Sequence, residues 1–401
     1  MRSATVLHSA AVLLYSNAPP PPPPPPRINP LTGDAPPAPS PRSAVVLLCS
    51  NTTSHANRDA PPAPSPRSVM VRHTVPCLFF LGQPIARAGR AAHRGRALPR
   101  ARDGSVAVVT GGNKGIGLEV CRQLASSGIT VVLTARDEKR GSEAVEKLQK
   151  AGLSEIIFYQ LDVTDAPNIG RLAHFMKARF GKLDILVNNA AVIGVEYVHD
   201  PVDVSVMSDK EFRGMDEHQM LEWLFKNIRE PYGAAKQCLE TNYYGIKHVI
   251  EAMLPLLVAS SDGRIVNVSS INGQLRVLNE ELRQELDDVD NLTEERLDEL
   301  LGKFLKDFEA GEAEAREWPT VLSAYKVSKT TMNSYSRILA KRHRELRVNC
   351  VHPGYVKTDM SLYSGVLTPA EGASNVTKVA LLPAGGPTGT FFAMGEEEPF
   401  V

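Results

Sequence analysis

The 401-residue sequence predicts an α/β fold in residues 104–401, a single Rossmann-type, doubly wound parallel sheet with helices on both faces. From residue 104 onward, apolar runs of strand length alternate with segments whose apolar residues recur at helical spacing. The first run, Val106 to Val109, leads into a glycine-rich turn and then a helical pattern. Strand, glycine turn and helix in this order are typical of sheets that bind nucleotides.

Residues 1–103 differ in composition from the rest of the chain. They contain 12 arginines, no lysine or glutamate and three aspartates, a net charge of +9, so residues 104–401 carry −9. The decapeptide DAPPAPSPRS occurs at residues 34–43 and again at 59–68. Such a segment buries too little apolar surface to offset its chain entropy. We therefore expect a disordered, low-complexity leader before one folded domain.

Three interpretations of this leader stay open. Arginine-rich, acid-poor sequence suits an organellar transit peptide, which would place the protein in a plastid. The proline tract at residues 19–26 suits a ligand of SH3 or WW domains. The third interpretation, an extended or wrongly assigned N-terminus, is favoured because the repeated blocks show no amphipathic pattern. On that interpretation we expect a cytoplasmic protein.

Composition argues against several classes of protein. The five cysteines are scattered and lack the spacing of metal ligands, so we expect neither a disulfide framework nor a metal site. No apolar run approaches the ~20 residues that a membrane-spanning helix needs. The acidic charge of residues 104–401 argues against nucleic acid as a partner, because phosphate binding requires a basic surface.

The turn after the first strand reads TGGNKGIG over residues 110–117. Glycine has no Cβ, so backbone N–H groups there can approach a pyrophosphate at the positive end of the following helix. A plain turn between a strand and a helix is the alternative interpretation. The residues predicted to bind a cofactor in this turn are Thr110, Gly111, Asn113, Lys114, Gly115, Ile116 and Gly117.

The second strand, expected at residues 130–135, ends at Arg136. Dinucleotide sites that prefer NAD place an acidic residue at this point, whereas arginine matches a 2′-phosphate. Lys114 would add a second positive charge. The alternative is that Arg136 belongs to the solvated charged run 136–140. Because the acidic residue is missing, the sequence favours NADP(H).

Polar residues follow several of the remaining expected strands. Those strands are residues 156–161, 183–187, 264–268, 346–351 and 389–393. Asp162 follows the first of them, and Ser269 and Ser270 follow the third. Ligands of open α/β sheets bind outside the carboxyl ends of the strands. We therefore expect both serines to face the cofactor.

Two insertions interrupt the alternation. In residues 192–240, apolar side chains from Met220 to Ile228 can gather on one helical face, which could pack into the core or lie as a lid over the substrate; we favour the lid. In residues 271–323, apolar residues from Leu297 to Phe308 recur at helical spacing after Thr293, a predicted N-cap. The second insertion thus predicts an amphipathic helix that needs a surface to pack on.

Tyr325 and Lys329 are four residues apart, so a helix places both on one face. A buried tyrosine beside a surface lysine is the alternative. A phenol with a pKa near 10 is a poor acid at neutral pH, and we expect the ammonium of Lys329 to lower that pKa toward the working range. The hydroxyl of Ser270 can bond to a substrate oxygen as negative charge develops on it.

Several of these motifs together resemble the short-chain dehydrogenase/reductase family over residues 104–401. They are the glycine turn, Asn188-Asn189-Ala190, Ser270, Tyr325-x-x-x-Lys329 and Pro353-Gly354-x-Val356-x-Thr358. The stretches TGGNKGIG, LTARD and GPTGTFF are similar to the monomeric NADPH carbonyl reductase branch, including plant salutaridine and menthone or neomenthol reductases. Ala191 replaces the glycine usual in the family, which is tolerable if its φ is negative.

The resemblance implies roles for individual residues. Asn242 would hold a helix kink and a proton-relay water, Ser270 would orient the substrate, and Tyr325 would donate the proton. Lys329 would tune the phenol and bind the nicotinamide ribose. The remaining cofactor contacts that it implies are Asp162, at the adenine amino group, Val163, Asn189, Pro353, Gly354, Val356 and Thr358. The helical insertion would cover the surface through which other members pair, so we expect a monomer.

Together these features predict NADPH-dependent reduction of a ketone or aldehyde to an alcohol, with a small hydrophobic carbonyl compound such as a terpenoid or alkaloid as substrate. A conjugated alkene reductase and a non-catalytic NADP(H)-binding regulatory protein are the alternatives. A tyrosine placed to protonate oxygen favours carbonyl chemistry. A regulatory protein would not need a proton donor beside a hydride donor.

Overall fold

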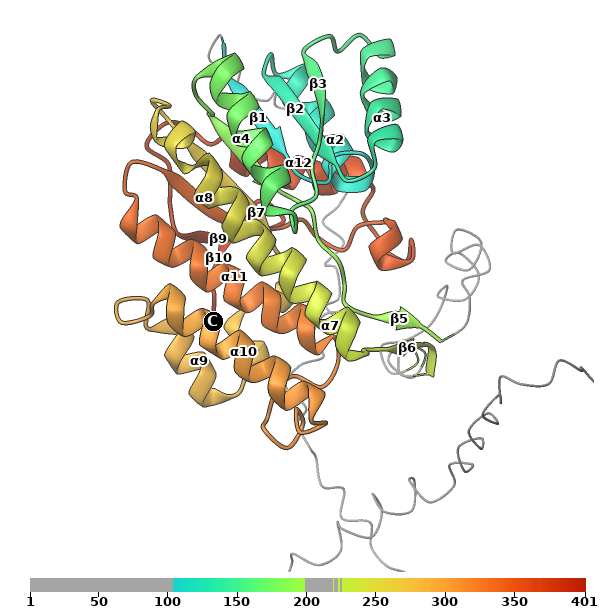
Figure 1. The fold of residues 1–401 in the computed structure, drawn as a ribbon, viewed down its shortest axis with the longest axis vertical. Helices are drawn as coiled ribbons and strands as arrows, with labels where there is room; N and C mark the ends of the chain where they lie inside the picture. The colour runs from blue at the N-terminus through green and yellow to red at the C-terminus, as the bar shows by residue number, and fades with distance from the viewer. Residues whose placement is uncertain (1–103, 199–218, 220–222, 224–225) are drawn as a thin grey trace, which may run out of the picture. The chain divides into compact units, whose positions relative to one another are not determined.

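The computed structural model describes residues 104–198, 219, 223 and 226–401 (Figure 1). The expected leader, residues 1–103, lies outside the described residues, as do Met220, Leu221 and Leu224 of the expected lid helix. Within the described residues, one eight-stranded sheet has the order β10-β9-β8-β7-β4-β1-β2-β3. Its strands are parallel except for the β9–β10 pair. The predicted doubly wound α/β fold is confirmed.

The strands of this sheet are β1 (Val106–Val109), β2 (Thr130–Ala135), β3 (Ile156–Gln160), β4 (Ile185–Asn188), β7 (Arg264–Val268), β8 (Arg347–His352), β9 (Thr390–Ala393) and β10 (Glu396–Glu398). A separate antiparallel pair consists of β5 (Glu196–Tyr197) and β6 (Ile228–Arg229). The helices are α2 (Gly115–Ser126), α3 (Glu138–Lys150), α4 (Ala166–Phe180), α7 (Tyr232–Leu239), α8 (Gly245–Val258), α9 (Glu280–Asp287), α10 (Glu294–Glu309), α11 (Ser323–Arg342) and α12 (Pro369–Ala380).

Alternation along β1 explains why both faces of the sheet are covered. Val106 and Val108 belong to the core cluster that includes residues of α4, α8 and α11, whereas Ala107 and Val109 belong to the cluster that includes residues of α2, α3 and α12. Successive side chains of a strand point to opposite faces, so a strand buried on both faces must be apolar throughout. The chain moves outward from β1 through β2 to β3 and then returns to β4 on the other side of β1. The strand order reverses there, at the crevice where such sheets bind ligands.

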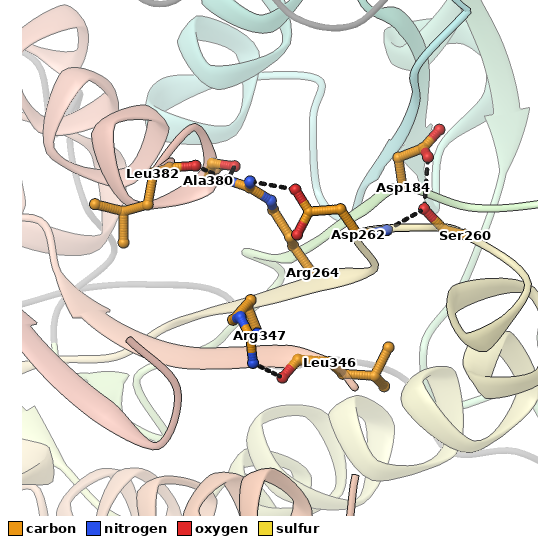
Figure 2. Close-up of polar contacts among 8 residues, drawn as sticks. All are labelled: Asp184, Ser260, Asp262, Arg264, Leu346, Arg347, Ala380 and Leu382. Carbon is orange, nitrogen blue, oxygen red and sulfur yellow. Dashed lines mark hydrogen bonds and ion pairs between the residues drawn. The ribbon is translucent and has the colours of Figure 1, made fainter. Parts of the chain in front are cut away.

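The amino-terminal edge of the sheet is held by a polar network (Figure 2). The Arg264 guanidinium donates to the Ala380 carbonyl at 3.0 Å, donates to the Leu382 carbonyl, and pairs with Asp262 at 2.6 Å. The Ser260 hydroxyl donates to the Asp184 carboxylate at 2.6 Å. These bonds tie the starts of β4 and β7 to the end of α12. They lie at the edge opposite the carboxyl ends of the strands and serve the fold.

The helix predicted in the second insertion is confirmed as α10. The Thr293 hydroxyl accepts from the Arg296 N–H at 3.2 Å, and the apolar face of the helix is buried against α7 and α11. On its amino-terminal side, Asp298 accepts from Lys247 of α8 at 2.9 Å. The surface that this amphipathic helix needed is therefore supplied by the chain itself.

Two elements differ from the sequence predictions. Ile228, expected on the face of a lid helix, lies in β6 and pairs with Tyr197 of β5. A residue that pairs with a neighbouring strand has an extended backbone, so Ile228 cannot continue the helical pattern before it. β10 was not expected, since three consecutive glutamates disfavour a strand. It is an exposed edge, where charge discourages further pairing.

Among the described residues, no helix is long and apolar enough to cross a membrane. The same part of the chain contains no group of three or more His, Cys, Asp or Glu side chains arranged to hold a metal ion.

Candidate active site

The glycine turn is locked to the end of β4 by reciprocal hydrogen bonds. The Thr110 hydroxyl accepts from the backbone N–H groups of Asn189 and Ala190, each at 3.0 Å. The Asn189 side-chain amide donates to the carbonyls of Thr110 and Gly111 at 3.0 and 3.1 Å. Asn189 therefore fixes the turn as well as lying beside it. Ala191 is not among the described residues with positive φ, so the missing glycine costs no strain there.

The turn requires glycine at two kinds of position. Gly111 and Gly115 have φ of +64° and +56°, a left-handed backbone that other residues rarely adopt. Gly117 has no such φ, but a Cβ there would lie 2.4 Å from both the Asn189 side-chain nitrogen and the Gly111 carbonyl oxygen. Asn113 and Ile116 are half-buried in the same turn. The N-cap residue of α2, Lys114, makes no side-chain cap hydrogen bond, so within the described structure the first N–H groups of this helix are available to an anion.

The two cationic side chains expected at the cofactor phosphate differ in their surroundings. The side chain of Arg136 is exposed at the end of β2, and its guanidinium has no hydrogen-bond or ion-pair partner in the described part of the chain. Lys114 is ion-paired with Asp359, across 245 positions of sequence. Asp359 in turn accepts from the Tyr363 hydroxyl. From the sequence, both cations were expected to bind the phosphate alike. Within the described structure only Lys114 has a competing carboxylate, that of Asp359.

Asp162 and Val163 lie beyond the end of β3. The Asp162 carboxylate accepts from the Thr164 N–H and hydroxyl at 2.9 and 2.7 Å, which holds the start of the loop to α4. Val163 is buried, and a Cβ on Gly245 would lie 2.9 Å from its side chain. Both residues therefore stand at the carboxyl edge, as the sequence predicted.

The segment after β8 reaches back to the glycine turn. Gly354 has φ of +94°, and a Cβ there would lie 2.4 Å from Leu367. The Pro353 carbonyl accepts from Asn375 of α12 at 3.0 Å, and Val356 is buried. The side chain of Thr358 would lie 3.3 Å from a Cβ on Gly115. The structure thus brings the proline-glycine segment and the turn to one side of the crevice.

Asn242 sits at an irregularity between α7 and α8. Residues Glu240–Tyr244 form a π-helical turn, a distortion often found at functional sites. The fully buried Asn242 amide accepts from the Val192 N–H at 2.9 Å and donates to the Val192 carbonyl at 2.8 Å. It also donates to the Ser328 hydroxyl at 3.1 Å. Asn242 thereby joins the segment after β4 to α11.

Ser270 and Tyr325 are brought together at the carboxyl end of β7. Ser270 is the second residue after the end of β7. Its side chain caps the short turn Ile271–Gly273 by accepting from the Asn272 N–H at 3.1 Å. Its hydroxyl also interacts with the Tyr325 phenol and lowers the pKa of that phenol, against the larger effect of burial. Tyr325, the third residue of α11, is 8% exposed. Two hydroxyl groups from distant parts of the chain therefore share one small, mostly desolvated region.

The expected lowering of the Tyr325 pKa by Lys329 is wrong for this structure. Burial raises the pKa of Tyr325 to about 12, and the neighbouring Cys238 raises it further, while the Ser270 hydrogen bond lowers it. Desolvation disfavours the phenolate more strongly than its neighbours favour it. The sequence could not supply the degree of burial. At neutral pH Tyr325 therefore carries its proton.

Lys329 is buried beneath Tyr325. Its Nζ donates to the Val268 carbonyl at 2.7 Å and lies 5.9 Å from the centre of the Tyr325 ring. Burial lowers the pKa of Lys329 to about 8, and Cys238 and Cys350 counteract part of that shift. The ammonium thus holds a proton that it can release near physiological pH.

The sequence predicted that Ser269 faces the crevice, and this prediction is wrong. Its hydroxyl donates to the Asn333 side chain of α11 at 2.8 Å, and Asn333 donates to the Gly273 carbonyl at 2.8 Å. Successive residues after a strand point in opposite directions, so only one of two adjacent serines can face the site. Ser269 fixes α11 against the loop that carries Ser270.

Two residues near the site were missed by the sequence reasoning. Ser328 accepts from Asn242 and donates to the Tyr325 carbonyl at 2.8 Å, and Cys238 lies within 3.8 Å of the Ser328 hydroxyl. Ser328 is three residues after Tyr325, and Cys238 is four residues before Asn242. Helical spacing from the predicted residues was the available signal.

Comparisons with known proteins agree with this geometry. The family model described as short chain dehydrogenase matches residues 105–220 and 223–281. The chain is 48% identical over 299 residues to (+)-neomenthol dehydrogenase of Arabidopsis thaliana, covering 73% of this chain and 97% of that protein. It is 38% identical over 299 residues to Carbonyl reductase [NADPH] 1 of Homo sapiens, covering 71% and 95%.

A solved structure of salutaridine reductase from Papaver somniferum matches the fold with a TM-score of 0.67 at 46% identity, over 72% of this chain and 99% of that one. Identity of this size over nearly the whole of each relative, together with the strand order and the glycine turn, establishes the family. The chain belongs to the short-chain dehydrogenase/reductase family and is an oxidoreductase that uses a nicotinamide cofactor.

Proposed function

We propose that the protein reduces a ketone or aldehyde to an alcohol with NADPH. The observation that carries this proposal is the pair of hydroxyls from Ser270 and Tyr325, with Lys329 buried behind them, at the carboxyl edge of the sheet. A protonated phenol beside a second hydroxyl is suited to receive a carbonyl oxygen that gains negative charge.

The cofactor fits the residues present. The turn at residues 110–117 would be filled by a Cβ at Gly117, and the uncapped start of α2 offers N–H groups to a pyrophosphate. Arg136 and Lys114 would hold the 2′-phosphate, and Asp162 with Val163 would border the adenine. Asn189 would border the ribose, and the segment Pro353 to Thr358 would line the nicotinamide. When bound, the dihydronicotinamide supplies a hydride to the substrate carbon.

The chain's own residues would handle the proton. Ser270 donates a hydrogen bond to the substrate oxygen and Tyr325 donates its proton to it, which completes the alcohol. The positive charge of Lys329, whose pKa is about 8, would stabilise the phenolate left on Tyr325 until a proton from solvent restores the phenol. Asn242 keeps the kink at α7 and α8 in place and thereby the position of Ser328 against Tyr325.

The relatives support the finer assignments of cofactor and substrate class. The human relative is named for NADPH, and the plant relatives are named for neomenthol and salutaridine. Arg136 is exposed at the end of β2 and its guanidinium has no partner among the described residues, which agrees with NADPH, because NAD sites place an acidic residue there. We therefore assign a small hydrophobic carbonyl compound of the terpenoid or alkaloid type as substrate.

We further propose that the protein works as a monomer in the cytoplasm. The helix α10 packs its buried face on α7 and α11, and Lys247 of α8 pairs with Glu294 and Asp298 of α10. That face of α11 is then covered by the chain's own insertion and is not available to a second copy.

The test is a panel of cyclic ketones, terpenoid and alkaloid ketones, aldehydes, quinones and conjugated enones, assayed by the loss of NADPH absorbance with product analysis. Turnover of a ketone or aldehyde to the alcohol is the expected result. Saturation of the enone double bond with no alcohol formed would indicate alkene reduction instead. NADPH binding without turnover of any compound would favour a regulatory role.

A further inference from the structure

The helix that carries Tyr325 begins without a cap of its own. The residue before α11, Leu322, has φ +52° and ψ +43°, and its side chain makes no cap hydrogen bond. In contrast, α3, α4, α9, α10 and α12 each begin with a side chain that accepts from the first turn. The first N–H groups of a helix need acceptors from elsewhere when no local cap is present. Tyr325 is in that first turn, so the acceptor bears on its position.

Glu230 supplies the acceptor from a distant part of the chain. Its carboxylate accepts from the Ser323 N–H at 2.7 Å. Burial raises the pKa of Glu230, and the backbone N–H groups of Ser323, Leu322 and Ala324 counteract part of that shift. A left-handed residue followed by helical residues turns successive N–H groups toward one point, which suits a carboxylate. Bonds from N–H groups to an ionised acceptor are about twice as strong as neutral ones. The backbone directly before Tyr325 is therefore held to one carboxylate, through the hydrogen bond from Ser323.

The start of α11 borders a cavity. That cavity, of about 280 Å³, is lined by Ile228, Glu230, Phe308, Thr320, Val321 and Ser323. Ser323, Ala324 and Tyr325 are themselves buried, so the N–H group of Ser323 would pay a desolvation penalty if the Glu230 carboxylate were removed. Glu230 itself is fixed, because it follows β6 directly and precedes Pro231, the residue before α7. α7 packs against α11.

We infer that Glu230 is a positioning residue for the proton donor: its carboxylate anchors the first turn of α11 and so sets where the Tyr325 hydroxyl lies relative to Ser270. The inference rests on the proposed function. Glu230 touches neither of those side chains in the described structure and acts through the backbone of residues 322–324. A displacement of about 1 Å at a reacting group can cost on the order of 100-fold in rate.

The experiment compares Glu230→Ala with Thr293→Ala in the full chain. Thr293 caps α10 with one hydrogen bond and has no contact with the site, so it matches the loss of a helix cap. We expect Glu230→Ala to lower kcat roughly 10- to 100-fold while the Kd for NADPH stays within about twofold of wild type. Thr293→Ala should leave kcat unchanged. Glu230→Gln, which keeps an acceptor oxygen, should recover most of the lost rate.

A double-variant comparison separates positioning from a general loss of structure. Because Glu230 acts through Tyr325, adding Glu230→Ala to Tyr325→Phe should lower kcat no further. An equal loss in both backgrounds, or a kcat in Glu230→Ala equal to that of Thr293→Ala, would overturn the inference. If Glu230→Ala does not fold, Glu230→Asp takes its place, because one methylene less withdraws the carboxylate from the helix while keeping its charge. Wild-type kcat in Glu230→Asp would then count against the role.

The same data distinguish this inference from the proposed function. Full activity in Tyr325→Phe would refute the proposed proton donor and the inference with it. A large loss in Tyr325→Phe with wild-type kcat in the Glu230 variants would refute only the role of Glu230.

Discussion

Arg136 should contribute more to the selection of NADPH than Lys114, although the sequence offers both as phosphate ligands. Arg136 has no competing partner within the described residues, whereas Lys114 must exchange Asp359 for a phosphate. A hydrogen bond to a charged group is worth about 1.5 to 3 kcal/mol, roughly 10- to 150-fold in affinity. Because Arg136 is exposed, we expect the lower end of that range for Arg136→Ala.

The loss in Lys114→Met should be smaller. The side chains of Lys114 and Asp359 are 60% and 48% exposed, and an exposed ion pair contributes about 0.2 to 1 kcal/mol. Lys114 loses this ion-pair free energy when it binds the phosphate, so its net contribution to the binding of NADPH is smaller by that amount. Removing the competitor in Asp359→Asn should therefore tighten the binding of NADPH by about 1.4- to fivefold.

The assay is the Kd of NADPH and of NADH for each variant, measured by quenching of protein fluorescence at fixed ionic strength. NADH serves as the internal control, because it lacks the 2′-phosphate and its Kd should not change. A larger effect in Lys114→Met than in Arg136→Ala would refute the reasoning, as would parallel losses for both cofactors.

Three further predictions concern stability and the extent of the folded domain. Arg264→Met should lower the free energy of unfolding in urea by about 2 to 4 kcal/mol, because it removes the hydrogen bonds to the Ala380 and Leu382 carbonyls and the ion pair with Asp262. A loss below about 1 kcal/mol would contradict this. Because burial lowers the pKa of Lys329 to about 8, the unfolded chain binds the Lys329 proton more tightly than the folded chain does. The free energy of unfolding of wild type, relative to that of Lys329→Met, should therefore rise by up to about 3 kcal/mol between pH 8 and about pH 10.4. If this difference in free energy stayed flat or fell over that range, a lowered pKa for Lys329 would be excluded. A protein that begins at Asp103 should keep the kcat/KM and Tm of the full chain, because the two core clusters of the described structure consist of residues from 106 onward. Loss of cooperative melting would show that the leader belongs to the fold.

Local patterns in the sequence predicted much of the fold. The strands at residues 130–135 and 264–268 have the predicted limits, and Thr293 caps α10 as predicted. Each of these depends on periodicity or on residues within one turn of each other. The pairing of Tyr325 with Lys329 on one helix face follows from spacing in the same way.

Local sequence patterns could not predict contacts between residues that are distant in the sequence. Lys114 and Asp359 are separated by 245 positions, and Glu230 and Ser323 by 93. The direction of the Tyr325 pKa shift depends on how much of the phenol is desolvated, which only the packed structure defines. Ser269 and Ser270 could be told apart only once the packed structure showed that the Ser269 hydroxyl donates to Asn333.

The most direct test of the proposed chemistry is Tyr325→Phe, assayed with a carbonyl substrate from the panel. The substitution keeps the ring against Lys329 and removes the hydroxyl that bonds to Ser270. We predict that kcat falls by about 10² or more, the usual size of a general-acid contribution, while the Kd for NADPH stays near that of wild type. Wild-type kcat in Tyr325→Phe would contradict the assignment of Tyr325 as proton donor.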